Sequence, residues 1–190
     1  KVPSRSMYLE GRGSSFIGEY IDIAKKLKNA GANIIAMCCN TAHFAIDEIK
    51  QQINVPFINV IEEVVLETKN SGAKKIALIA SDGCLKGNVY ERYFDLLYPE
   101  ITLIYPDINL QKEVTRGICN IKNKNRFLDD FHPDRPKNIF RKVVEHLEGK
   151  GAEKVIIGCT DIRVDYEDKR VIDSLEVLTN KIINEFENGK

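Results

Sequence analysis

The sequence lacks several features that would assign a protein to a class at once. Its 28 Lys and Arg residues equal its 28 Asp and Glu residues, so the formal net charge is zero and the basic surplus typical of nucleic-acid-binding proteins is missing. A small basic patch at Lys122, Lys124 and Arg126 is interpreted as a solvated face. No run of about 18 apolar residues is present, which excludes a membrane-spanning helix, and no signal peptide is visible. We therefore expect neither nucleic acid nor a membrane as a partner.

The cysteines and histidines are too few and too scattered for a disulfide framework or a metal site. An odd number of cysteines, five, favours a reducing compartment, so we expect a cytoplasmic protein. No CxxC pair occurs and the three histidines lie far apart, whereas a structural zinc site needs four suitable ligands. We therefore expect no bound metal.

The chain has 190 residues, of which 43% are hydrophobic, and this is enough for one well-packed domain or two small lobes. It begins at Lys1 rather than at a methionine, and its first segment reads like the middle of a protein. We therefore expect further sequence upstream of Lys1.

Helical and strand-like patterns alternate along the chain. Short apolar runs predict strands at residues 33–38, 57–60, 75–80, 101–105 and 155–157, the first of them suited to a strand covered on both faces. Apolar periodicity, together with residues that start or end helices, predicts helices at residues 16–29, 41–52, 61–70, 86–96, 109–121, 137–149 and 174–187. This alternation predicts parallel βαβ units and an α/β fold.

An internal repeat places two cysteines at equivalent positions. Gly31 and Gly151 are each followed by alanine and an apolar run, and Cys39 and Cys159 lie eight residues beyond them (39 − 31 and 159 − 151). A third copy begins at Gly72 and has alanine at the eighth position. Each glycine is predicted to end a helix in the left-handed conformation. Both cysteines then follow strand C-terminal ends, the edge at which α/β sheets bind ligands.

Two facing cysteines suit the inversion of an amino acid, because a thiolate accepts a proton and a thiol donates one. The free amides and the dipole of the helix after Cys39 are expected to attract anions and to lower a thiol pKa, and the turn after Cys159 offers a similar setting. Asn40 or Thr41 is predicted to cap that helix. Asn40, Thr41 and Thr160 are predicted to hold the substrate α-carboxylate.

Structural interpretations remain open beside the catalytic one. A cysteine after an apolar strand is more often a small core residue, and this interpretation is applied to Cys38, Cys84 and Cys119. For Cys39 and Cys159, which occupy matched positions in the repeat, a catalytic role is as well supported by the pattern as a role in the core. His43 is interpreted as a helix residue near the cleft rather than as a base or a ligand. A disulfide between Cys39 and Cys159 is interpreted as a side reaction.

Two motifs resemble signatures of the aspartate/glutamate racemase superfamily. Residues Cys39 to His43 (CNTAH) resemble the first signature of the aspartate racemase branch, and Gly158 to Asp161 (GCTD) resemble the second, which usually ends in Glu. The glutamate racemase branch usually has Ser at the position of His43 and His at that of Asp161, so the chain is closer to the aspartate branch. The resemblance covers essentially the whole chain, including residues 171–174.

The resemblance implies two Rossmann-like α/β lobes whose parallel sheets are related by a pseudo-twofold repeat, with the site between them and no pyridoxal phosphate or other cofactor. Residues 1–70 plus 172–190 would form the lobe of Cys39, and residues 71–171 the lobe of Cys159. Family members usually begin with a strand, a glycine-bearing loop, a helix and a second strand. The chain starts after these, so the first lobe is expected to lack its N-terminal strands.

Two further site residues follow from the resemblance. Arg5, within residues 2–6, resembles a family arginine that contacts the substrate carboxylate, for which a planar guanidinium is well suited. Lys122, at the end of residues 118–122, resembles a lysine near the site and would bind the side-chain carboxylate. Asp161, which replaces the usual Glu and is shorter by one methylene, is also expected to be a substrate-binding residue. The alternatives are a frayed terminal arginine and a solvated lysine. A homodimer is also implied.

The resulting hypothesis is a cofactor-independent racemase that acts on a small amino acid, aspartate and as a further candidate glutamate, through Cys39 and Cys159. One alternative is another enzyme of the superfamily, an isomerase or decarboxylase of a small dicarboxylate, since a fold does not fix the reaction. The other is a non-catalytic protein that binds an acidic metabolite, which is motivated by the shorter Asp161 and by the missing N-terminal strands.

Overall fold

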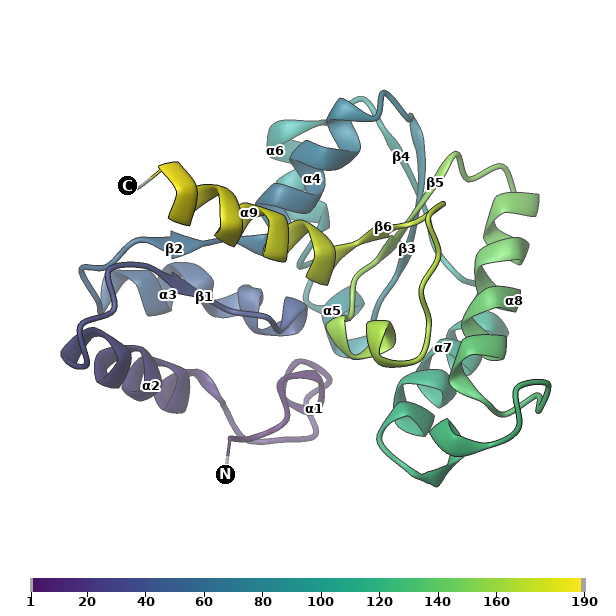
Figure 1. The fold of residues 1–190 in the computed structure, drawn as a ribbon, viewed down its shortest axis with the longest axis horizontal. Helices are drawn as coiled ribbons and strands as arrows, with labels where there is room; N and C mark the ends of the chain where they lie inside the picture. The colour runs from purple at the N-terminus through teal and green to yellow at the C-terminus, as the bar shows by residue number, and fades with distance from the viewer. Residues whose placement is uncertain (1, 189–190) are drawn as a thin grey trace.

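A computed structural model of the protein describes residues 2–188, and this part of the chain contains two parallel β-sheets (Figure 1). The smaller sheet pairs β1 (Ile35–Ala36) with β2 (Phe57–Ile58). The larger sheet has the order β4 (Thr102–Ile104), β3 (Lys75–Ile79), β5 (Lys154–Ile157), β6 (Ile172–Asp173), and every neighbouring pair is parallel. The predicted α/β fold is confirmed.

Helices connect the strands and lie mostly where the apolar periodicity predicts them. They are α1 (Arg5–Leu9), α2 (Ile17–Asn29), α3 (Ile46–Gln51), α4 (Val60–Asn70), α5 (Asp82–Lys86), α6 (Glu91–Leu97), α7 (Ile108–Ile121), α8 (Pro136–Gly149) and α9 (Ser174–Asn188). Short 3₁₀ helices occur at η1 (Asn40–Ala45), η2 (Lys124–Phe127) and η3 (Thr160–Val164). No helix within residues 2–188 is long and apolar enough to cross a membrane.

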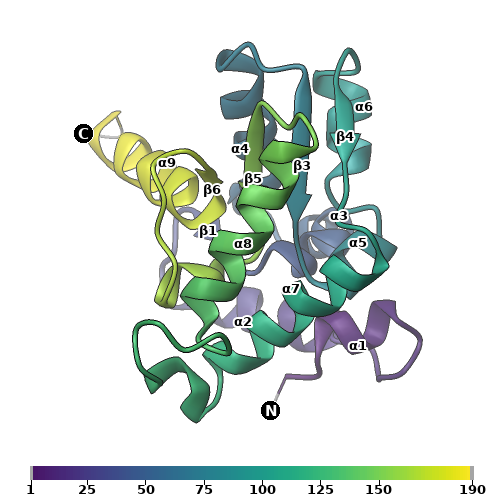
Figure 2. The ribbon, with the colours of Figure 1, turned by 90° about the vertical axis from the view of Figure 1, so that its right-hand side faces the viewer.

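The four-stranded sheet is covered by helices on both faces (Figure 2). Successive side chains of a strand point to opposite faces. Ala77 and Ile79 of β3 therefore belong to the hydrophobic cluster of α7 and α8, whereas Ile76 and Leu78 belong to that of α4 and α6. Burial on both faces explains why this strand reads as a continuous apolar run.

The strand before Cys39 differs from the prediction, because only one of its faces is covered. Ile35 and Met37 are buried in a cluster with α2 and α3, while Ala36 and Cys38 are exposed. The predicted burial on both faces is wrong, and so is the interpretation of Cys38 as a core residue. The cause is the two-residue alternation of a strand that is packed on one side only.

The helix predicted at residues 86–96 is present as α6 (Glu91–Leu97), but its predicted start is wrong, because α5 ends at Lys86 and α6 begins only at Glu91. Between them Asn88 has a positive φ of 48°, a conformation that Asn tolerates better than most residues. In contrast, the three glycines of the repeat have the predicted left-handed conformation. The φ angles of Gly31, Gly72 and Gly151 are 94°, 73° and 91°.

Helix α1, which the sequence does not predict, lies directly on α5. The amide of Gly83 donates a hydrogen bond to Ser6 Oγ at 3.0 Å. A Cβ atom at Gly83 would lie 2.4 Å from Ser6 Cα, so this close approach requires glycine. The contact fixes α1, and with it Arg5, beside the rest of the chain.

The proposed division into lobes remains a prediction, and the structure places one of its segments differently. Strand β6, assigned to the first lobe from residue 172, pairs instead with β5 in the four-stranded sheet. Helix α9 then returns to α4 and β2, as Figure 1 shows. The side chains of α4 and Leu178 of α9 share a hydrophobic cluster with the four-stranded sheet.

Candidate active site

Cys39 and Cys159 occupy equivalent positions after their strands. Cys39 follows β1 and immediately precedes η1, and Cys159 follows β5 and immediately precedes η3. Both have extended backbone conformations and are half-buried. The two side chains interact electrostatically, since the charge of Cys39 contributes to raising the pKa of Cys159. The repeat thus brings the two thiols into one site.

The surroundings of Cys159 favour the protonated thiol. Burial raises its pKa to about 12, the Asp161 carboxylate adds to this rise, and a hydrogen bond from the Asp161 amide opposes it. The expected lowering by the free amides of the turn is therefore present but smaller than the effects of burial and of the neighbouring carboxylate. The prediction that this turn favours a thiolate is wrong for Cys159.

Arg5 lies against Cys39. Burial disfavours its guanidinium, but the charge of Cys39 and a hydrogen bond to the Cys39 side chain outweigh burial and raise the pKa of Arg5. Arg5 also interacts with the charge of Asp161, and its Nη1 donates to the carbonyl of Pro3 at 3.2 Å. Arg5 is therefore a half-buried residue of the site and not a frayed terminal side chain.

Lys122 and Asp161 form an ion pair beside Cys159. Lys122 caps the C-terminus of α7, and its Nζ lies 2.7 Å from Asp161 Oδ2. Desolvation disfavours the Lys122 ammonium, but the hydrogen bond and charge of Asp161, with a further contribution from Cys159, raise the pKa of Lys122. The structure therefore brings both predicted residues to the Cys159 side of the site.

The side chains of Asn40 and Thr41 are engaged inside the protein. Asn40 Oδ1 accepts a hydrogen bond from the Tyr90 hydroxyl at 2.7 Å, and Asn40 Nδ2 donates to Ser174 Oγ at 2.9 Å. Thr41 Oγ1 lies 3.1 Å from Ser81 Oγ. The helix that follows Cys39 is the 3₁₀ helix η1, and no side chain caps its N-terminus. The predicted cap by Asn40 or Thr41 is therefore wrong. These other partners explain why neither side chain turns back to the helix.

Thr160 begins η3 directly after Cys159 and is half-buried. Its predicted contact with the substrate carboxylate, like those of Asn40 and Thr41, stays a prediction.

His43 is buried completely and holds the Cys39 backbone. Its Nδ1 lies 3.0 Å from the Cys39 carbonyl, and its Nε2 accepts a hydrogen bond from the Val60 amide at 3.3 Å. This pairing requires Nδ1 to carry the proton and to donate it to the carbonyl. Burial lowers the pKa of His43 to about 4, against a smaller opposing effect of the hydrogen bond to Cys39. His43 is thus a neutral structural residue next to the site, as interpreted from the sequence.

Four residues around the cysteines escape the sequence prediction: Tyr20, Ser81, Tyr90 and Ser174. Ser81 directly follows the eighth position of the third repeat copy, and that spacing is the signal that could have found it. The two tyrosines lie in apolar helical patterns that are typical of core residues. Among residues 2–188, no group of three or more His, Cys, Asp or Glu side chains is arranged to hold a metal ion.

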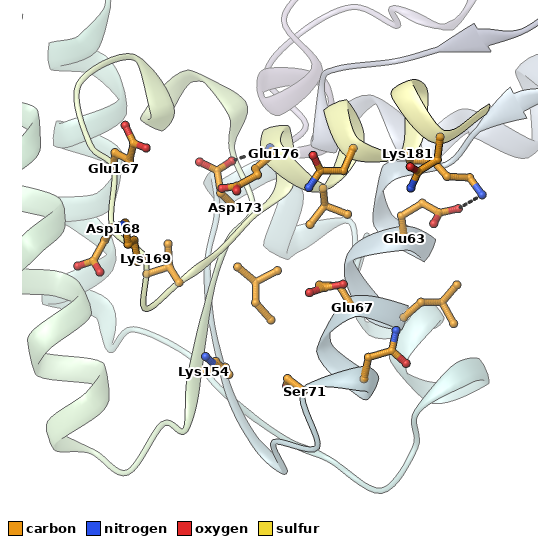
Figure 3. A pocket seen from close by; sticks show the side chains of 17 residues that line it. Glu63, Glu67, Ser71, Lys154, Glu167, Asp168, Lys169, Asp173, Glu176 and Lys181 are labelled. Carbon is orange, nitrogen blue, oxygen red and sulfur yellow. Dashed lines mark hydrogen bonds and ion pairs between the residues drawn. The ribbon is translucent and has the colours of Figure 1, made fainter. Parts of the chain in front are cut away.

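A separate groove of about 680 Å³ lies between α4, α9 and the segment before β6 (Figure 3). None of the predicted site residues lines it. Its wall carries the carboxylates of Glu63, Glu67, Glu167, Asp168, Asp173 and Glu176. Several of these are already paired: Arg163 contacts Asp173, Glu176 and Glu167, and Lys181 contacts Glu63. The lysines that line the groove, Lys154, Lys169 and Lys181, are fewer than its carboxylates, so the groove is acidic. The candidate site is the one at the cysteines, where the predicted residues lie.

Comparison with known proteins identifies the family. A family model described as Asp/Glu/Hydantoin racemase matches residues 2–182. The chain belongs to this family. Within it, the chain is 32% identical to the glutamate racemase of Aquifex pyrophilus over 181 residues, covering 86% of the chain and 63% of that protein. It is 29% identical to a broad specificity amino-acid racemase of Bacillus subtilis over 142 residues, covering 75% of the chain and 58% of that protein.

Solved structures of the Asp/Glu racemase type share the fold. The Picrophilus torridus aspartate racemase matches with a TM-score of 0.79 at 22% identity, over 96% of the chain and 74% of that chain. An aspartate racemase homologue from Pyrococcus horikoshii matches with a TM-score of 0.69 at 27% identity, over 92% and 74%. The chain spans about three fifths of the length of the two curated racemases above. The resemblance found from the CNTAH and GCTD motifs is confirmed at the level of the family.

Proposed function

We propose that this member of the Asp/Glu/Hydantoin racemase family is an isomerase that interconverts the enantiomers of a small acidic amino acid, aspartate in the first place and glutamate as a further substrate. Cys39 and Cys159 act as the two acid–base groups, and no pyridoxal phosphate or other cofactor takes part. The observation that carries the proposal is the convergence of two strand-end thiols with Arg5, Lys122 and Asp161.

The charges of the site suit a dicarboxylic amino acid. Such a substrate carries two carboxylates and one ammonium group at neutral pH. Arg5 and Lys122 supply two cations, and Asp161 supplies one carboxylate between them. Arg5 would bind one substrate carboxylate, Lys122 the other, and Asp161 the ammonium group. Asp161 would exchange part of its contact with Lys122 for the substrate.

The proposed reaction needs one thiolate and one thiol. The thiolate takes the α-proton, and the electron pair of the broken C–H bond stays on the α-carbon, delocalised into the α-carboxylate. The thiol on the opposite face then gives its proton to that carbon, which inverts the configuration. Arg5, with the amides and hydroxyls of Asn40, Thr41 and Thr160, would stabilise the charge that develops on the carboxylate.

The test is exchange of the α-proton with heavy water, starting from L-aspartate and from D-aspartate. The wild-type protein should incorporate deuterium from both enantiomers, and Cys39→Ser and Cys159→Ser should each lose racemisation. Cys119→Ser is the matched control, because Cys119 is an exposed cysteine on α7 and should be dispensable. Exchange that persists in both active-site variants would sink the proposal.

The other two hypotheses are distinguished by the same material. Turnover of maleate or a malonate without exchange of aspartate would indicate another enzyme of the superfamily. Calorimetric binding of aspartate without any exchange would indicate a protein that only binds an acidic metabolite. A cytoplasmic location and a homodimer are further proposals, the first from the odd number of cysteines and the second from the family resemblance.

A further inference from the structure

Tyr90 is a completely buried tyrosine that immediately precedes α6 and contacts the residue after Cys39. Its hydroxyl donates a hydrogen bond to Asn40 Oδ1 at 2.7 Å. The other end of the same amide, Asn40 Nδ2, donates to Ser174 Oγ at 2.9 Å. Asn40 and Ser174 are buried as well. The Asn40 side chain is therefore held at both its oxygen and its nitrogen, which fixes the backbone that directly follows Cys39.

The ring of Tyr90 packs against Gly158, which directly precedes Cys159. A Cβ atom at position 158 would lie 3.0 Å from Tyr90 Cε2, which is closer than ordinary van der Waals contact. Cε2 adjoins the ring carbon that bears the hydroxyl, so this contact and the hydrogen bond to Asn40 are made by the same end of the side chain. The Gly158 amide donates to the Ile79 carbonyl at 2.7 Å. One side chain thus contacts both segments that carry a cysteine.

Tyr90 comes from the third copy of the internal repeat, which has no cysteine at its eighth position. That copy begins at Gly72, forms β3 and continues through α5 to Tyr90. Strand β3 pairs with β5, the strand before Cys159, and α5 contacts η1, the 3₁₀ helix after Cys39. The copy without a cysteine therefore lies against both cysteine segments and is placed to set the distance between them.

We propose that Tyr90 is a positioning residue that holds Cys39 and Cys159 at a fixed separation across the substrate. Its hydroxyl acts on the first cysteine through Asn40, and its ring acts on the second through Gly158. This inference rests on the proposed racemase function. It deepens that function because it names a residue outside both sequence motifs, which acts through its neighbours rather than on the substrate.

The hydroxyl distinguishes this role from ordinary core packing. Tyr90 belongs to the hydrophobic cluster of α4 and α6, where a phenylalanine would fill nearly the same volume. A buried hydroxyl or amide without a partner costs free energy, and here Tyr90 and Asn40 satisfy each other. Loss of the hydroxyl would leave Asn40 Oδ1 buried without this partner. The amide would then shift toward another partner, and the backbone beside Cys39 would move with it.

The proposed reaction depends on the separation of the two thiols, because one takes the α-proton and the other returns a proton on the opposite face of the same carbon. Each pair of reacting atoms must approach to about 3–3.5 Å. A displacement of about 0.5 Å in one segment is then expected to lower the rate about tenfold. Arg5 and Lys122, the cations assigned to the substrate carboxylates, do not belong to this network, so substrate binding should change little.

The experiment measures kcat and KM for L-aspartate and D-aspartate in the wild type, Tyr90→Phe and Tyr98→Phe. Tyr98→Phe is the matched control. Tyr98 is buried in the same hydrophobic cluster, lies at the other end of α6 and donates its hydroxyl to the Ala73 carbonyl at 3.0 Å. Tyr90→Phe should lower kcat about tenfold in both directions, while KM stays within about twofold. Tyr98→Phe should lose a similar amount of stability in urea and keep both kinetic constants.

The inference is overturned if Tyr90→Phe keeps the wild-type kcat, if its loss lies only in KM, or if Tyr98→Phe loses kcat equally. Ser174→Ala covers the case in which Tyr90→Phe does not fold. This variant removes the other hydrogen bond of the Asn40 amide and leaves the Tyr90 ring in the core. Its kcat should again fall at nearly constant KM, and an unchanged kcat would overturn the inference.

Failure of this inference and failure of the proposed function are distinguishable, because amide NMR spectra require no turnover. In Tyr90→Phe the resonances of residues 39–41 and 158–160 should both shift, together with the Asn40 side-chain amide, whereas Tyr98→Phe should shift neither segment. Shifts in one segment alone, or in neither, would overturn the inference even in an active racemase. A wild type without α-proton exchange removes the racemase function and the role of Tyr90 in turnover, and paired shifts would still show that Tyr90 links the two segments.

Discussion

Lys122 Nζ lies 2.7 Å from Asp161 Oδ2, which joins the end of α7 to the turn that follows Cys159. The two side chains are 60% and 44% exposed, so the ion pair itself adds little to stability. Its importance is the charge that it places beside Cys159, where Asp161 raises and Lys122 lowers the pKa of the thiol.

Replacement of Asp161 by Asn should therefore activate Cys159 without unfolding the protein. Loss of the carboxylate removes the second-largest cause of the raised pKa, so the pKa of Cys159 should fall below about 12, while burial still keeps it above the ordinary value. The pH profile of Cys159 alkylation reports this directly. Asp134→Asn is the control, because Asp134 also pairs with a cation of α7, Arg116. An unchanged Cys159 profile in Asp161→Asn would contradict the assignment.

The buried His43 predicts a specific loss of stability in acid. Its pKa is lowered from 6.5 in the unfolded chain to about 4 in the folded protein. The neutral ring therefore contributes stability that is fully present above pH 6.5 and is lost as the pH falls through 4. The difference corresponds to about 3 kcal/mol of unfolding free energy.

The measurement is urea unfolding as a function of pH in the wild type and in His43→Gln. Carboxylates also titrate in this range, so the difference between the two proteins isolates His43. His43→Gln should be less stable near neutral pH and should lose less stability on acidification. Parallel curves for the two proteins would show that His43 is not held neutral.

Two glycines should respond to the same substitution with opposite signs. A Cβ at Gly117 of α7 would lie 2.6 Å from Phe140 Cζ of α8, in a buried contact, so Gly117→Ala should destabilise the protein by about 1–3 kcal/mol. At Gly149, the last residue of α8, nothing lies within 4 Å and φ is not positive, so Gly149→Ala should stabilise by about 0.5 kcal/mol. Urea midpoints compare the two variants, and a shift of the same sign in both would refute the packing argument.

Much of the fold is predictable from the sequence because burial on both faces and helix-ending glycines leave local signals. The continuous apolar run of β3 and the left-handed Gly31, Gly72 and Gly151 are examples. The predictions fail where a tertiary contact decides. The exposure of Cys38 depends on which face of β1 is packed, and α1 depends on its contact with α5. Neither leaves a periodic pattern in the sequence.

The candidate site likewise has a part that the sequence predicts and a part that depends on tertiary contacts. The repeat spacing is enough to predict that Cys39 and Cys159 occupy equivalent strand ends. The different environments of the two thiols are not predictable, because they arise from Tyr20 and Arg5 on one side and from burial beside Asp161 on the other. Periodicity alone gives Tyr20 the appearance of an ordinary apolar helix residue.

Because Gly83 lies so close to Ser6, a residue that has no side chain influences the chemistry of the site. Ser6 follows Arg5 directly, and a methyl group at position 83 would meet the Ser6 backbone at 2.4 Å. Helix α1 would then have to shift, and the Arg5 guanidinium would move relative to the Cys39 sulfur. Gly83→Ala would thus keep every ionisable group named above and change only the position of Arg5 relative to Cys39. A loss of activity in this variant would show that the reaction depends on that distance and not only on which side chains are present.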